Sequence, residues 1–300
     1  MDKVGRYSEA LDAQVELLNY WGQEQNRGLY EYALVDKGMD RGQASLMIDW
    51  AIDTLKVGEP YYVSPVICEL LFEAAKSIPH SWRLTEDALF TPSGFLWLKK
   101  PFHTPNEDGP TIALGWAIIA LTSQGRYLLP STEDPGERAV IISYFEQLEG
   151  VPAVPMNVYL WKFGGDLSEI PIKDVERPGQ ANQLGCLFAT LMTFLQQRIM
   201  VSSKFRADRM TRRRAEKAAR KPITEDINVI QLRRVEHRTG EGEHRDVEWA
   251  CRWTVKGHWR NQPYGLAGQK HYRPKWIAPY IKGPEDKPLR NPERLFAVIR

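Results

Sequence analysis

The hydrophobic positions near the start of the chain recur at helical spacing. In residues 8–22 apolar side chains repeat every three or four positions, and Ser8 is a suitable N-cap. The same spacing recurs in 41–56, and Ser64 followed by Pro65 is a favourable start for a third helix. We expect these three helices to form a small bundle.

Four apolar runs of strand length follow, separated by turns rich in Pro, Gly and Asp. They span 94–102, 111–121, 139–148 and 157–165. Runs bounded in this way are typical of an antiparallel meander. The second run is also compatible with a buried helix, because a fully apolar segment has no period that separates the two.

From Gln180 onward helical spacing returns, and no Gly or Pro interrupts the chain between Cys186 and Lys221. The pattern predicts one helix of up to about 40 residues, near 60 Å long at ~1.5 Å per residue. A helix of that length would project, bend or lie across another surface. Its second half, 204–221, contains nine Lys and Arg against two Asp and Glu.

The remainder shows strand alternation four times. The expected strands are 227–235, 247–260, 271–282 and 294–300. We therefore predict an α+β protein with an N-terminal helical bundle and antiparallel meander, a long basic helix and a C-terminal four-stranded antiparallel sheet. The expected regions are an acidic helical and meander region, 1–177, and a region with the basic helix and Trp-rich sheet, 178–300.

Composition narrows the class of protein. With 300 residues and 43% hydrophobic content, the chain can bury a substantial core. The three cysteines, Cys68, Cys186 and Cys251, are odd in number and form no CxxC pair, which favours a reducing compartment. The start lacks a signal-peptide pattern, and the apolar run 112–121 is too short for a bilayer. We expect a cytoplasmic protein without a membrane partner.

Charge is distributed unequally along the chain. Residues 204–300 contain 24 Lys and Arg against 12 Asp and Glu, whereas residues 1–203 contain 16 against 26. A concentrated positive field raises the affinity for polyanions, which predicts a nucleic-acid partner for the rear half. The alternative is that the two oppositely charged halves attract each other.

Candidate nucleic-acid-binding residues come from the basic helix and from the cationic face of the rear strands. They are Lys204, Arg206, Arg209, Arg212, Arg213, Arg214, Lys217, Arg220, Arg252, Lys256 and Arg273. Like charges stacked at helical spacing repel one another unless an anion or an acidic surface lies against them. A solvated helix that meets the acidic half of the same protein is the alternative interpretation.

The strand 247–260 combines an aromatic face with a cationic one. Alternation places Val247, Trp249, Cys251, Trp253, Val255 and Trp259 on the apolar side, and Arg252, Lys256, His258 and Arg260 on the other. A bulge at Gly257 could shift the direction of Trp259. Clustered tryptophans are more typical of a hydrophobic core, and a platform for stacked bases is the alternative interpretation.

A candidate catalytic set lies in the same region: His258, His271, Arg260 and Lys282. A metal-independent ribonuclease needs a base, an acid and cations that stabilise the phosphorane, and these residue types supply all three. Structural or surface roles for the histidines are the alternative. The chain has no Walker loop, GxGxxG, GxSxG, HExxH or EF-hand pattern, so no metal or other cofactor is expected.

Three motifs resemble a known family. They are LRR at 232–234, WTVKGHWRNQ at 253–262 and WIAPYIKGPEDKPL at 276–289, with a looser likeness in DRMTRRRAEKA. Together they resemble a family of uncharacterised proteins from actinobacteria and their phages, over about the last quarter of the chain. The resemblance implies an actinobacterial or phage setting, such as host takeover, antiviral defence or a toxin system, and implies no activity.

The leading hypothesis is a nucleic-acid-binding protein, with RNA favoured over DNA. A helix followed by an antiparallel meander also resembles the barnase and RelE-like ribonuclease architecture, which supports a ribonuclease toxin as the second hypothesis. A third hypothesis is a protein-interaction module whose basic half binds an acidic protein partner.

Overall fold

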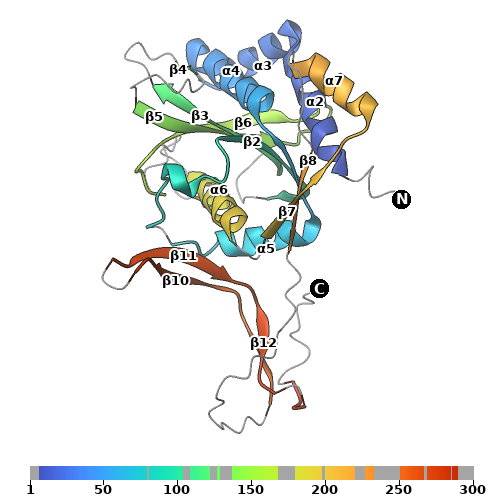
Figure 1. Ribbon diagram of the computed structural model, residues 1–300. Coiled ribbons are helices and arrows are strands. Elements are labelled where there is room, and N and C mark those ends of the chain that lie inside the picture. The colour runs from blue at the N-terminus through green and yellow to red at the C-terminus, as the bar shows by residue number, and fades with distance from the viewer. Residues whose placement is uncertain are drawn as a thin grey trace.

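A computed structural model provides the coordinates of the protein. It describes residues 7–79, 81–103, 109–121, 127–128, 137–167, 180–197, 200–219, 227–232, 251–266, 269–284 and 286–289. These residues form an α+β fold in which helices cover both faces of a mixed sheet, with a two-stranded ribbon on one side of this body (Figure 1).

The predicted helices of the front region are present, and one was missed. They are α2 (Glu9–Trp21), α4 (Arg41–Val57) and α5 (Pro65–Ala75), and the additional helix is α3 (Glu24–Asp36). Among the α3 side chains only Leu34 is buried, so its sequence has no apolar stripe to reveal it. The predicted bundle is wrong, because α2 and α4 pack on one face of the sheet and α5 on the other.

The predicted meander is confirmed as part of a larger sheet. Its strands are β2 (Ser93–Phe102), β3 (Thr111–Leu121), β5 (Glu137–Glu146) and β6 (Val154–Lys162). The run 111–121 is therefore a strand and not a buried helix. The short strand β4 (Tyr127–Leu128) pairs with β3, and β1 (Pro60–Val63) pairs in parallel with β2. The order is β6-β5-β3-β2-β1-β8-β7, where β7 is Met200–Phe205 and β8 is Ile227–Leu232.

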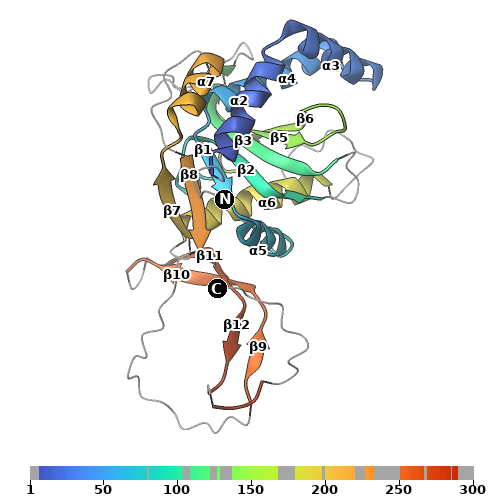
Figure 2. The same cartoon turned by 90° about the vertical axis from the view of Figure 1, so that its right-hand side faces the viewer.

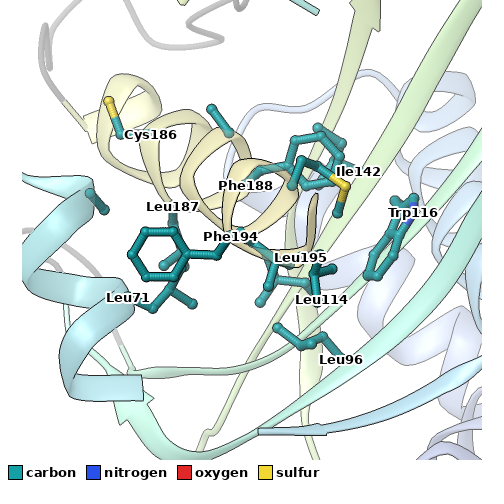
Figure 3. Close-up of a cluster of buried hydrophobic side chains, with 14 of the residues drawn as sticks. Leu71, Leu96, Leu114, Trp116, Ile142, Cys186, Leu187, Phe188, Phe194 and Leu195 are labelled. Atoms are coloured by element: carbon teal, nitrogen blue, oxygen red, sulfur yellow. The ribbon is translucent and has the colours of Figure 1, made fainter. Parts of the chain in front are cut away.

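Both faces of the central strands are buried, which explains why their sequences are almost continuously apolar. Leu114 and Trp116 of β3 face α5 and α6, whereas Phe95 of β2 and Ala113 of β3 face α2 and α4. Figure 3 shows the first of these clusters, in which Phe194 of α6 lies beside Leu71 of α5. This three-layer core positions the ends of α5 and α6 toward the ribbon.

The predicted long basic helix is wrong, because a strand divides it. The chain forms α6 (Gln180–Gln196), then β7 (Met200–Phe205), then α7 (Arg209–Ala219). Asp208 caps α7, where its Oδ1 accepts hydrogen bonds from the backbone N–H groups of Met210 (2.8 Å) and Thr211 (3.0 Å). Hydrogen bonds to β8 pair one side of the β7 backbone. This pairing favours a strand over the helix that the absence of Gly and Pro would permit.

The predicted four-stranded rear sheet is also wrong. Its first strand, β8 (Ile227–Leu232), joins the central sheet between β1 and β7, so this sheet contains strands from both 1–177 and 178–300. The rest forms two short antiparallel pairs, β10 (His258–Tyr264) with β11 (His271–Ile277) and β9 (Trp253–Val255) with β12 (Tyr280–Lys282). The expected strand 294–300 and residues 233–250, including Val247 and Trp249, lie outside the described residues.

Candidate nucleic-acid interface

The two antiparallel pairs are consecutive parts of one bent hairpin, residues 253–282, which we call the ribbon. The β10–β11 part lies against the body, and the β9–β12 part projects away from it (Figures 1 and 2). The bend falls at Gly257. A Cβ atom at this position would lie 2.4 Å from the ring of Trp276, so only glycine allows the tryptophan to pack there.

One face of the ribbon anchors it to the body through aromatic side chains. Trp259 and Trp276 form a cross-strand pair with ring centroids 5.3 Å apart, and both rings contact that of Phe194. The Trp259 Nε1–H also donates a hydrogen bond of 2.9 Å to the backbone oxygen of Ala74 in α5. Trp276 is buried, and Trp259 is partly buried against the same core cluster, which favours the core interpretation for Trp259.

The opposite face of β10–β11 is rich in cations. Strand alternation and register place eight residues on this outer face: His258, Arg260, Gln262, Tyr264, His271, Arg273, Lys275 and Ile277. Arg260 and Lys275 are direct cross-strand partners, and both are exposed. Like charges in this position repel each other, so an anion bound between them would be stabilising.

The whole ribbon region has few acidic groups to neutralise these cations. Residues 251–289 contain eight Lys and Arg against only Glu285 and Asp286. One neutralising contact comes from the body, where Asp87 forms an ion pair of 2.7 Å with Arg273. A hydrogen bond from the Thr85 side chain, then one from the Asp87 backbone and the charge of Arg273, lower the pKa of Asp87. Arg273 is therefore a weaker candidate for phosphate binding than Arg260 and Lys275.

The predicted catalytic residues do not converge. His258 pairs with Ile277 at one end of β10–β11, and His271 pairs with Tyr264 at the other end. Six residues at ~3.4 Å each separate the two histidines by roughly 20 Å. The Nδ1–H group of His258 donates a hydrogen bond of 3.1 Å to the backbone oxygen of Lys256, two residues earlier in the chain. The separation of roughly 20 Å between His258 and His271 is too great for the two histidines to act as acid and base on one phosphate.

The other predicted residues of the C-terminal region lie next to the bend or beyond it. Lys282 of β12 has its ammonium 5.9 Å from the ring centroid of Trp253, within cation–π distance. Arg252 is occupied structurally, because its Nε–H donates to the backbone oxygen of Lys287 (2.9 Å). Lys256 is exposed next to the bend and continues the positive surface.

The predicted basic helix forms a second, separate cationic surface. Thr211 and Ala215 of α7 are buried against α2. On the exposed side, cationic residues recur one turn apart at Arg209, Arg213 and Lys217. Figures 1 and 2 place α7 at the opposite end of the body from β10–β11. The predicted nucleic-acid-binding residues therefore occupy two surfaces instead of one.

Part of this second surface is neutralised by the acidic front region, as expected from the alternative in which the basic helix meets the acidic half of the same protein. Arg214 forms an ion pair of 2.7 Å with Asp12 of α2. Arg212 is half-buried, whereas Lys204 and Arg206 are exposed at the end of β7. Arg220 lies outside the described residues.

Lys275 belongs to the outer face but was not among the predicted residues, whereas Gln262 and Tyr264 stand in the motif GHWRNQPYG beside the predicted His258 and Arg260. The signal was present in the sequence, because alternation in HYRPKWI places Lys275 on the same side as Arg273 and His271. Only the cross-strand register, which depends on the turn, joins these side chains to Arg260 and Tyr264.

Other kinds of site find little support in the described part of the chain. Within it, no group of three or more His, Cys, Asp or Glu is placed to hold a metal ion, and no helix combines the length and hydrophobicity of a membrane span. The three cysteines are free thiols. Burial raises the pKa of both Cys68 and Cys186 to about 11, so these thiols are protonated at neutral pH and poor nucleophiles.

Comparisons with known proteins give limited information. No family model matches the chain, and a search of curated proteins also finds no match. Among solved structures, the chain is similar to the one described as "Crystal structure of AcrVA2". The TM-score is 0.43 and the sequence identity 10%, over 94% of this chain and 98% of that chain.

Proposed function

We propose that the protein binds nucleic acid, with RNA favoured over DNA, through the outer face of the ribbon. The observation that carries this proposal is the exposed, directly opposed pair Arg260 and Lys275 on an anchored ribbon with few carboxylates. Each cation that contacts a phosphate releases a counterion, which supplies salt-dependent affinity. An ordered strand also holds its cations in fixed positions.

The shape of the interface supports the same proposal. A two-stranded ribbon is narrow enough to enter a groove or to lie along a single strand. The tryptophans on the anchor face fix the ribbon to the body without using the outer face. The resemblance of the rear motifs to proteins of actinobacteria and their phages adds a phage-related setting to this proposal.

The two alternative functions receive less support. A ribonuclease that uses His258 and His271 together is disfavoured by their separation along the ribbon. An acidic protein partner remains compatible with a cationic surface. Such a partner would be revealed by stoichiometric capture together with RNA binding that depends little on salt.

The test compares two charge-matched triple variants. One changes the ribbon, Lys256→Gln with Arg260→Gln and Lys275→Gln, and the other changes α7 at three exposed positions: Arg209→Gln, Arg213→Gln and Lys217→Gln. Fluorescence anisotropy with labelled RNA and DNA 20-mers would be measured at several salt concentrations. We expect the ribbon variant to reduce the slope of log K against log salt by about 2, at ~0.7 per lost contact with a single strand.

The α7 variant carries the same loss of charge and serves as the control. We expect it to keep most of the wild-type slope, because α7 lies at the other end of the body. Absence of salt-dependent binding in the wild-type protein would overturn the proposal. The proposal would also be overturned if the α7 variant lost the salt dependence of binding and the ribbon variant retained it.

A further inference from the structure

An aromatic pair lies at the end of the cationic outer face, next to the turn of the ribbon. Tyr264 and His271 are direct cross-strand partners, and their rings stack with centroids 6.0 Å apart and an interplanar angle of 22°. Both side chains are exposed, and 41% of the Tyr264 surface is accessible. Two exposed and nearly parallel rings form an aromatic platform of the kind on which a nucleic-acid base can stack.

The turn holds this platform in place. Gly265 has a φ of +98°, a conformation that favours glycine, and a Cβ atom there would lie 2.7 Å from the backbone oxygen of Gln269. The backbone N–H of Gln269 donates to the oxygen of Leu266 (3.1 Å), which closes the turn. The rings are therefore positioned by tight backbone geometry and by the ladder of β10 and β11.

The platform and the cations follow one line along the outer face. Behind Tyr264 and His271, the next pair on this face contains Arg273, and the following pair is Arg260 with Lys275. Successive pairs are spaced by roughly 7 Å, which is two residues of an antiparallel strand. This spacing suits an extended sugar-phosphate backbone that runs along the ribbon while its bases point to one side.

We propose that the outer face of the ribbon binds an unpaired nucleic-acid strand, with one base stacked on the Tyr264–His271 pair. This inference rests on the proposed function and specifies its substrate class. In a duplex the faces of the bases are already covered by neighbouring bases, so an aromatic platform offers a duplex little. Stacking also tolerates any base, so recognition here does not require a particular sequence.

The test removes the platform and uses a tyrosine of the opposite face as its control. Tyr264→Ser deletes one ring of the stacked pair, whereas Tyr272→Ser deletes a ring that is 63% exposed on the anchor face, one residue away from His271. Affinities for a 12-nucleotide single-stranded RNA and for its duplex would be measured at one salt concentration. Thermal unfolding of each variant would be recorded in parallel.

We expect single-stranded RNA to bind more tightly than the duplex. Tyr264→Ser should weaken single-strand binding by about 5- to 150-fold, the fold-change that corresponds to one lost base–aromatic contact. Tyr264→Phe should bind like the wild type, because the ring is retained. Tyr272→Ser should also leave binding unchanged, and Tyr264→Ser should preserve the salt slope because no cation is removed.

The outcomes separate this inference from the proposed function. Salt-dependent binding that is equal for single strand and duplex, and unaffected by Tyr264→Ser, would overturn the inference and leave the function standing. If Tyr272→Ser weakened the binding of single-stranded RNA and Tyr264→Ser did not, the assignment of the Tyr264–His271 pair as the stacking platform would be overturned. Absence of any nucleic-acid binding would refute both proposals together.

Discussion

Removal of the Trp259 ring should release the ribbon from the body while the central sheet stays folded. An isolated two-stranded hairpin is marginally stable in water, so β10 and β11 depend on their anchor. Trp259 contributes ring contacts with Phe194 and Trp276 and one hydrogen bond to the backbone of Ala74. At ~0.5–1.5 kcal/mol per aromatic pair and ~1 kcal/mol for the hydrogen bond, the loss is about 3 kcal/mol.

Native-state hydrogen exchange measures this loss locally. In Trp259→Ala, amide protection in β10 and β11 should fall by about 150-fold, which corresponds to ~3 kcal/mol. Trp259→Phe keeps most of the ring and loses the hydrogen bond, so its effect should be near fivefold, or ~1 kcal/mol. Amides of β3 and β5 should keep their protection. Unchanged exchange in the ribbon, or an equal loss in β3 and β5, would refute this account of the anchor.

Three further predictions concern α7 and the thiols. Arg214→Gln should lower the free energy of unfolding by less than about 1 kcal/mol in chemical denaturation, because its ion pair with α2 is exposed. Asp208→Ala should lower the melting temperature at neutral pH, because the helix cap is lost. Hydrogen bonds from the side chain and backbone of Thr211, and then from the backbone N–H of Met210, lower the pKa of Asp208, so the cap stabilises the fold above pH 3.8. The difference between variant and wild type should therefore shrink as the pH falls through the lowered pKa. In thiol labelling at neutral pH, Cys251 should react first, and Cys68 should react only on unfolding.

The sequence was sufficient for elements whose hydrophobic pattern has a single interpretation. The stripe of α2 was predicted because burial of one face leaves a period in the sequence, and β2, β5 and β6 were predicted because turn residues bound apolar runs of strand length. For the run of β3 the sequence left a buried helix open. Pairing across long separations left no such trace. The segment 200–205 forms β7 by pairing with β8. Strand β8 in turn belongs to the central sheet through its parallel pairing with β1, which is far away in the sequence.

The candidate site was predictable in the same limited way. Alternation within one strand correctly placed His258 and Arg260 on one face. Which residues of the returning strand oppose them depends on the turn at Gly265, and this register both added Lys275 and separated His258 from His271. Residue types alone suggested that His258 and His271 form a catalytic pair, whereas the cross-strand register places them at opposite ends of β10 and β11.

Photocrosslinking of bound single-stranded RNA, with the modified peptides identified by mass spectrometry, tests the central claim most directly. The account predicts crosslinks in peptides that contain 258–266 and 271–277, with Tyr264 among the modified residues and much weaker crosslinks in the ribbon triple variant. Crosslinks confined to α7, or to the helices α2, α3 and α4, would contradict it.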